Sequence, residues 1–289
     1  MRIEKMIQTL TEEEFRNRKR EKLMNYEYYA EENNDYFTLM PGARRNLSDP
    51  EWLATKEPGK RSMVASAVAD FSINMLTLGY SAGAELAELR TFYPSIVEAW
   101  ITNERYHVEY GQSPSGSYAI VATYALLGDD FYFVNRMVCF GILLGWGEHL
   151  SHVARIIEHN NSRMDAMLER MLSFYVPGRD TNLTKCTRHL PYFKTLKIFN
   201  ASPEARPGLM AEYLKEWYAA SRREPYYDSH NRDTSFKGYW SWEAAAITFL
   251  LDIDDSSYRN AEFYPADLVD FARRAKFEGV PRDRHHEKR

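Results

Sequence analysis

The stretch GYWSWEAAAITFLLDIDD, residues 238–255, decides the fold of this chain. Its alanines and large aliphatic side chains favour a helix from Trp242 to Leu251, a run that contains neither glycine nor proline. Apolar side chains lie on nearly every side of that helix, which predicts that it is buried. Ser241 directly precedes the helix, and we expect its hydroxyl to cap the first turn.

A second helix is expected soon after, in the segment YPADLVDFAR, residues 264–273. Pro265 suits the first helical position, and Asp267 falls in the first turn, where the helix dipole favours a carboxylate. The residues expected on its apolar stripe are Leu268, Phe271, Ala272 and Ala275. The C-terminal region is therefore predicted to be a helix, an acidic turn and a second helix.

The remaining sequence also indicates helices. Thr11 and Glu14 resemble a capping box that opens a long charged helix reaching about Glu32, and a turn-rich linker is expected over residues 40–59. Further helices are expected at 61–78, 84–106, 162–174, 188–199 and 203–222, with a kink or a break at Pro94. No alternation of period two persists long enough to predict a strand. We therefore predict an all-α fold.

The expected architecture is a multi-helix globular bundle, with two packed helical halves as one way of arranging it. The N-terminal helical region is placed at residues 8–130 and the C-terminal helical region at 131–276. Residues 277–289 are expected to form a basic, disordered tail.

Composition narrows the classes of function. The chain has 289 residues, 44% of them hydrophobic, which is enough for a sizeable core. A net charge of −4 argues against direct nucleic-acid binding. Cys139 and Cys186 are too few for a disulfide framework, and no N-terminal apolar region or run of 18 apolar residues is present. We expect a cytoplasmic protein without a membrane association.

Catalytic motifs are missing from the sequence. It contains no glycine-rich phosphate loop, no GxSxG motif and no four-ligand zinc spacing. The tightest histidine group is Glu148, His149 and His152, whose spacing does not place all three on one helix face. We therefore expect no catalytic residue, no metal and no cofactor, and a protein that is not an enzyme. A helical metal-dependent hydrolase using these three residues remains one alternative, and a helical scaffold with another partner remains a second.

Charge is unevenly distributed near the C-terminus. Residues 236–270 contain seven acidic residues and two basic ones, a local balance of −5, whereas seven bases and three acids follow from Arg273 onward. Several carboxylates so close together are expected to be solvated or paired with cations.

The segments at residues 238–246, 253–256 and 264–270 resemble the PoNi family, immunity proteins against PoNe-type DNase toxins. Residues 190–192, 217–218 and 226–230 also fit the C-terminal half of that family. The resemblance implies an all-helical cytoplasmic protein that binds and neutralises a DNase effector of the PD-(D/E)xK class. It also implies that the toxin is delivered by a type VI secretion system.

The acidic turn is our candidate surface for binding the toxin. A DNase is positively charged where it meets phosphate, so an inhibitor needs carboxylates at the same place. The candidate toxin-binding residues are Asp252, Asp254, Asp255, Tyr258 and Glu262, with Tyr258 as the aromatic anchor. The alternative for Asp254 and Asp255 is that they cap helices.

Four further residues are assigned structural roles. Glu243 lies within an apolar helix, so we expect a buried carboxylate bonded to Arg, His or Tyr. Tyr239, Trp240 and Trp242 are expected in the core because the helix they introduce is apolar on most sides. A homodimer is left open as an additional association.

Overall fold

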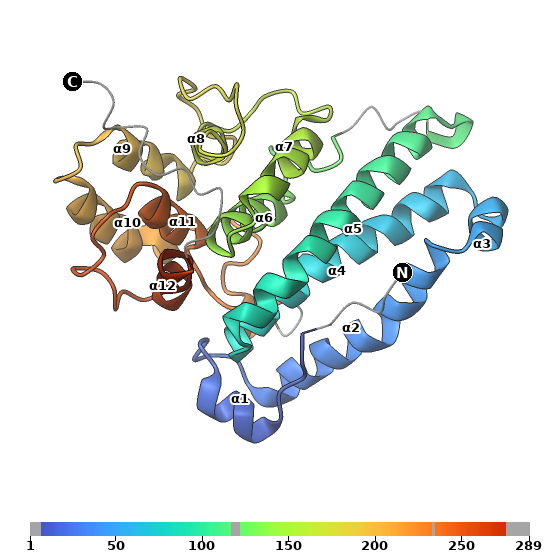
Figure 1. Ribbon diagram of the computed structural model, residues 1–289, viewed down its shortest axis with the longest axis horizontal. Coiled ribbons are helices and arrows are strands. Elements are labelled where there is room, and N and C mark those ends of the chain that lie inside the picture. Colours follow the sequence, from blue (N-terminus) through green and yellow to red (C-terminus); the bar gives the residue numbers. More distant parts are fainter. Residues whose placement is uncertain (1–6, 117–121, 233–234, 276–289) are drawn as a thin grey trace. The chain divides into compact units, whose positions relative to one another are not determined.

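The computed structural model describes residues 7–116, 122–232 and 235–275 (Figure 1). Every regular element within these ranges is an α-helix or a short 3-10 helix, and the described residues contain no strand. The prediction of an all-α fold is confirmed.

The described chain divides into two compact units. The described residues of unit 1 are 7–116, 122–125, 156–161, 225–232 and 235–239, and those of unit 2 are 126–155, 162–224 and 240–275. The predicted halves, 8–130 and 131–276, are continuous stretches, whereas each unit is assembled from three segments. The predicted tail, 277–289, lies outside the described residues.

Unit 1 is built around a pair of long helices. Its helices are α1 (Glu12–Arg18), α2 (Tyr26–Asn46), α3 (Pro50–Thr55), α4 (Pro58–Ala82) and α5 (Leu86–Gln112), followed by the short 3-10 helix η1 (Pro114–Gly116). α4 and α5 lie side by side, and α2 packs against α4 (Figure 1). Gly83 ends α4 with φ of 101°, and a Cβ there would lie 2.4 Å from the carbonyl oxygen of Arg18. Only glycine fits this tight turn.

α4 is a described helix long and apolar enough to cross a membrane by length and composition alone. The structure buries 61% of its most apolar 18-residue window. Because α5 and α2 pack against it, α4 has the surroundings of a core helix.

The predicted long helix from Thr11 to Glu32 is wrong. The capping box of Thr11 and Glu14 is present, but α1 ends at Arg18 and α2 begins only at Tyr26. Arg20 explains the interruption, because its backbone N–H donates to the carbonyl of Ser81 and its guanidinium donates to the carbonyls of Tyr80 and Ala84. These hydrogen bonds to the end of α4 keep Arg20 away from the position that it would have in a continuous helix.

The predicted linker over residues 40–59 is also wrong. α2 continues through Pro41 to Asn46, and Pro50 and Pro58 occupy the first turns of α3 and α4, where the missing N–H costs nothing. At Pro94, where a kink or a break was expected, α5 continues without a break.

Unit 2 contains shorter helices. They are α6 (Phe131–Leu143), α8 (Ala166–Leu172), α9 (Thr195–Asn200), α10 (Arg206–Ala220), α11 (Trp242–Leu250) and α12 (Ala266–Arg274). α7 (Leu150–Glu158) begins in unit 2 and ends in unit 1. The 3-10 helices are η2 (Gly147–His149) and η3 (Tyr192–Lys194) in unit 2, and η4 (Ser229–Asn231) in unit 1.

α11 forms the centre of unit 2. It packs against α6, α8 and α12, and every residue from Trp242 to Thr248 is buried. The predicted helix and its burial are confirmed, with the helix ending one residue early at Leu250. Ser241 occupies the N-cap position without a capping hydrogen bond, so that expectation is wrong. Its hydroxyl donates instead to the carboxylate of Glu243, at 2.8 Å.

Candidate functional site

The acidic turn, residues 251–265, connects α11 to α12 in unit 2. Near its two ends are the non-glycine residues Asp252, with φ of 48°, and Phe263, with φ of 68°. Aspartate tolerates the left-handed region, but a bulky phenylalanine is strained there. Phe263 is held by ring contacts with Trp217 and Tyr218, each at 5.3 Å between ring centroids. Its carbonyl also accepts the backbone N–H of Ser241 at 2.8 Å, so the end of the turn is fixed.

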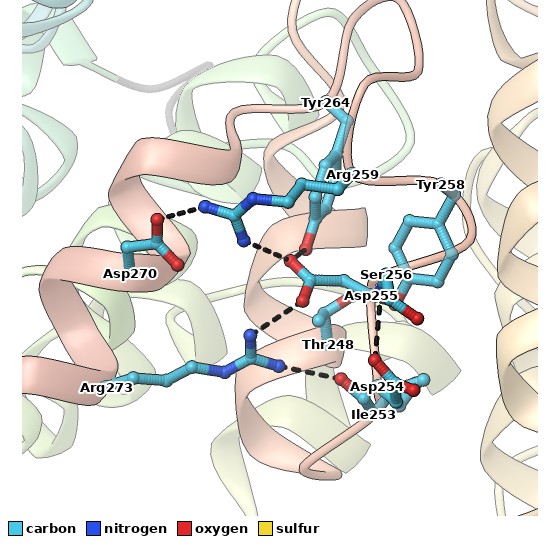
Figure 2. A network of polar contacts seen from close by, with 10 residues as sticks. All are labelled: Thr248, Ile253, Asp254, Asp255, Ser256, Tyr258, Arg259, Tyr264, Asp270 and Arg273. Atoms are coloured by element: carbon cyan, nitrogen blue, oxygen red, sulfur yellow. Dashed lines mark hydrogen bonds and ion pairs between the residues drawn. The ribbon is translucent and has the colours of Figure 1, made fainter.

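Asp255 lies at the centre of the turn with its carboxylate buried (Figure 2). Arg273 donates to Oδ1 at 2.8 Å, while the Tyr264 hydroxyl and Arg259 donate to Oδ2 at 3.0 and 3.4 Å. Burial on its own would raise the pKa of Asp255. The hydrogen bond and charge of Arg273, the hydrogen bond of Tyr264 and the charge of Arg259 outweigh burial and lower this pKa below its ordinary value. Asp255 is thus an ionised, internally neutralised carboxylate.

The same arginines extend this network to α12. Arg259 also forms an ion pair with Asp270, and Arg273 also donates to the carbonyl of Ile253 at 2.7 Å (Figure 2). Because Asp270 and Arg273 both belong to α12, these contacts fasten the helix to the turn that precedes it.

Tyr258, the predicted aromatic anchor, lies in the interior and is 3% exposed. Its hydroxyl is 2.9 Å from the Thr248 hydroxyl, and its ring meets that of Tyr264 edge-on at 5.1 Å. Burial raises the pKa of Tyr258 to about 12. In the free protein Tyr258 and Asp255 therefore support the turn from inside, and their contact with a toxin stays a prediction.

Asp252, Asp254 and Glu262 are the exposed members of the predicted site. Asp254 accepts the backbone N–H of Ser256 at 3.0 Å, which gives the chain an Asx turn rather than a helix cap. Within the described residues, none of the three forms an ion pair, although Asp252 contributes at longer range to the raised pKa of Arg273. These three exposed carboxylates are available to a partner.

Glu243 organises the core beneath the turn and is 1% exposed. Its Oε1 accepts hydrogen bonds from the Tyr213 hydroxyl at 2.6 Å, Trp217 Nε1 at 2.7 Å and Ser241, and its Oε2 accepts Asn135 Nδ2 at 3.1 Å. Four donors, from α6, α10 and the N-cap of α11, converge on one carboxyl group. Sequence reasoning named the tyrosine class of partner but missed Trp217 and Asn135, because α6 and α10 are distant in sequence.

The other three residues given structural roles differ in their surroundings. In unit 2, Trp242 is buried against Phe140, with ring centroids 4.6 Å apart, while Trp240 is half-buried. In unit 1, Tyr239 is buried and its hydroxyl lies 2.7 Å from His230 Nδ1.

Among the described residues, Glu148, His149 and His152 do not form a metal-binding cluster. Glu148 and His152 are exposed, and the ring of His149 lies 5.3 Å from that of Trp146. Among the residues that the structure describes, no three His, Cys, Asp or Glu side chains are arranged to hold one metal ion.

Comparison with known families tests the resemblance directly. Residues 163–268 match the family model described as PoNe immunity proteins (PoNi), C-terminal. This part of the chain is similar to the C-terminal region of PoNi proteins. The match includes α8 to α11, the whole acidic turn and the start of α12, so the resemblance based on residues 238–270 is confirmed.

Two further comparisons bear on the fold. The crystal structure of protein PA2201 from Pseudomonas aeruginosa has a TM-score of 0.66 with this chain, at 18% sequence identity. The alignment covers 84% of this chain and 88% of that one. At this identity the likeness shows a shared fold and carries no argument about function. No curated protein matches the chain.

Proposed function

We propose that this chain is an immunity protein that binds a cognate DNase effector toxin and neutralises it, without catalysis of its own. The match of residues 163–268 to the PoNi C-terminal family supports this role. The proposal includes a toxin of the PD-(D/E)xK class, its delivery by a type VI secretion system, and a cytoplasmic immunity protein.

The acidic turn is the observation that carries the proposal. Asp255 and Asp270 are paired with Arg273 and Arg259, so the acidic side chains inside the network do not repel one another. The charge that remains exposed on the turn comes from Asp252, Asp254 and Glu262. A nuclease must be positive where it binds phosphate, and three carboxylates on a fixed turn are complementary to such a surface.

The geometry also supports rapid association. Exposed carboxylates attract a basic partner over distances comparable to the Debye length, about 8 Å at physiological salt. A toxin released in the cytoplasm must be captured before it reaches DNA, so a fast, charge-steered encounter suits this task.

The test begins with the gene that adjoins the gene of this chain; if it encodes a nuclease, that nuclease is purified and mixed with the chain. We expect a stoichiometric complex in size-exclusion chromatography with light scattering, and loss of cleavage of linear DNA once the chain equals the nuclease. Light scattering of the chain alone also shows whether it is a homodimer. Undiminished cleavage at a large excess of chain, with no complex, contradicts the proposal.

A further inference from the structure

A second surface in unit 2 lies outside the acidic turn. It is an open groove of about 470 Å³ between α9 and α10, which we name the α9–α10 groove. Its floor is formed by Leu196, Ile198 and Tyr213, all buried, and its mouth is flanked by Phe193 and Leu209. The groove is large enough to accept side chains from another molecule.

The floor of this groove is held in place from below. The Tyr213 ring lines the groove while its hydroxyl donates to the buried carboxylate of Glu243 at 2.6 Å. Ile198 is 1% exposed and belongs to the packed core. Because these side chains are already fixed, little binding free energy is spent on ordering the groove when a ligand enters.

Phe193 gives the mouth an exposed aromatic side chain. It is 42% exposed, and its ring stacks on that of His189 at 5.2 Å with planes 10° apart. An aromatic residue beside a fixed apolar floor has the composition of a binding hot spot.

The two rims of the groove carry opposite charges. Glu212 and Glu216 lie on the α10 rim, and Lys194 and Lys197 lie on the α9 side. Lys194 and Glu216 form an ion pair with each other, and this contact lowers the pKa of Glu216. In the part of the chain that the structure describes, Glu212 and Lys197 form no ion pair. The rims therefore offer one acidic and one basic position to an occupant.

We propose that the α9–α10 groove binds an amphipathic segment of the toxin. An apolar side chain of that segment enters between Phe193 and Leu209, a basic side chain meets Glu212, and an acidic side chain meets Lys197. This inference rests on the proposed function, because the occupant is the same partner. Every residue of the groove lies within 163–268, the region shared with the PoNi family.

The two surfaces act on different steps of binding. Exposed carboxylates on the acidic turn accelerate the encounter, whereas burial of apolar side chains in the groove slows dissociation. The groove thus supplies specificity for the cognate toxin, because a merely basic protein lacks the matching apolar segment.

The experiment compares groove variants with matched variants elsewhere in unit 2. Phe193→Ala with Leu209→Ala removes both flanking side chains, and Glu212→Lys reverses the rim charge. The controls are Leu127→Ala, at a leucine that is 50% exposed outside the groove, and Glu148→Lys, at an exposed glutamate. Binding rates with the purified nuclease encoded beside this chain are measured, with a melting curve for each variant.

We expect Phe193→Ala with Leu209→Ala to raise Kd about tenfold or more, mainly through faster dissociation. Glu212→Lys should raise Kd mainly through slower association, and the controls should bind as the wild type does. If the double variant folds poorly, the single variants Phe193→Ala and Glu212→Lys, both at exposed positions, take its place in the test. Unchanged Kd in folded groove variants, with tight binding by the wild type, overturns the groove and leaves the proposed function intact. Absence of binding by the wild type overturns both.

Discussion

Arg273 of α12 binds the Asp255 carboxylate at 2.8 Å and the Ile253 carbonyl at 2.7 Å through different nitrogens of one guanidinium (Figure 2). A planar group with donors in a fixed fork can bridge a side chain and a backbone carbonyl in this way. The first base of the cationic C-terminal segment thus folds back onto the most acidic part of the chain. It neutralises the inner carboxylate and leaves the outer ones exposed.

Replacing Arg273 tests this bridge. Arg273→Met keeps much of the apolar stem but removes both hydrogen bonds, so we expect a loss of about 1–2 kcal/mol in the free energy of unfolding. The loss lies toward the lower end because Arg273 is 30% exposed and Arg259 still reaches Asp255. Urea denaturation measures it. The control is Arg274→Met, at the exposed neighbouring position, which should change stability by less than about 0.5 kcal/mol. Equal losses in both variants would refute the bridge.

Acid titration should reveal the Asp255 network. Its pKa is lower in the folded protein than in the unfolded chain, so the unfolded chain binds more protons in acid. The contribution of ionised Asp255 to the free energy of unfolding is therefore fully present above about pH 4, the range of an unperturbed aspartate. It is lost as the pH falls through the pKa of Asp255 in the folded protein. We expect Asp255→Asn to be less stable than the wild type at neutral pH, with the difference shrinking toward pH 2.

The test depends on the difference in the free energy of unfolding between the wild type and Asp255→Asn at each pH. Burial raises the pKa values of Asp165 and Glu224, so these carboxyl groups change stability with the opposite sign. They are common to both proteins and cancel in the comparison. A difference between wild type and Asp255→Asn that stays constant from neutral pH to pH 2 contradicts the assignment.

Glu243 should show a graded response to substitution. Glu243→Ala leaves the buried donors of Tyr213, Trp217 and Ser241 without their acceptor, and we expect a loss of about 3 kcal/mol or more. Glu243→Gln keeps one oxygen for them but turns an NH2 group toward the Asn135 amide, so about 1–2 kcal/mol should be lost. Denaturation midpoints give the order. The control is Glu262→Gln, at an exposed position. A Glu243→Gln variant that is less stable than Glu243→Ala would contradict this role of Glu243.

The sequence predicted well what depends on local pattern. The all-round apolar character of residues 242–250 indicated burial, and Thr11 with Glu14 indicated a helix start. It failed where distant residues compete for the backbone. Arg20 leaves the helical path to bind the end of α4, and Glu21 accepts the backbone N–H of Tyr239, 218 residues away. No local window contains such partners.

The candidate site shows the same limit. The sequence located the acidic turn but could not separate inner from outer carboxylates, because Asp254 and Asp255 are adjacent and chemically alike. What separates them is Arg273, 18 residues further on, which reaches Asp255 while Asp254 faces solvent. The interior position of Tyr258 depends likewise on Thr248, one helix earlier.

The exposed carboxylates of the acidic turn should govern the rate of toxin capture. Neutral, nearly isosteric changes preserve the turn: Asp252→Asn suits the positive φ, Asp254→Asn keeps an oxygen for the Ser256 N–H, and Glu262→Gln is exposed. We expect this triple variant to melt close to the wild type and to bind the toxin with an association rate about tenfold lower at low salt. Its rate should also depend less on salt, while its dissociation rate changes little.

A charge-matched control separates this local effect from a change in net charge. Glu31→Gln, Glu148→Gln and Asp180→Asn remove the same three charges at exposed positions outside the turn, and Asn182 N–H, now bonded to Asp180, retains an acceptor. If long-range attraction alone mattered, both triple variants would slow association equally, since they have the same net charge. If the turn faces the toxin, its variant slows association more, because attraction decays within about one Debye length. Identical association rates in the wild type and the folded turn variant would move the interface away from the turn, and residues 12–32 would then be the next segment to test.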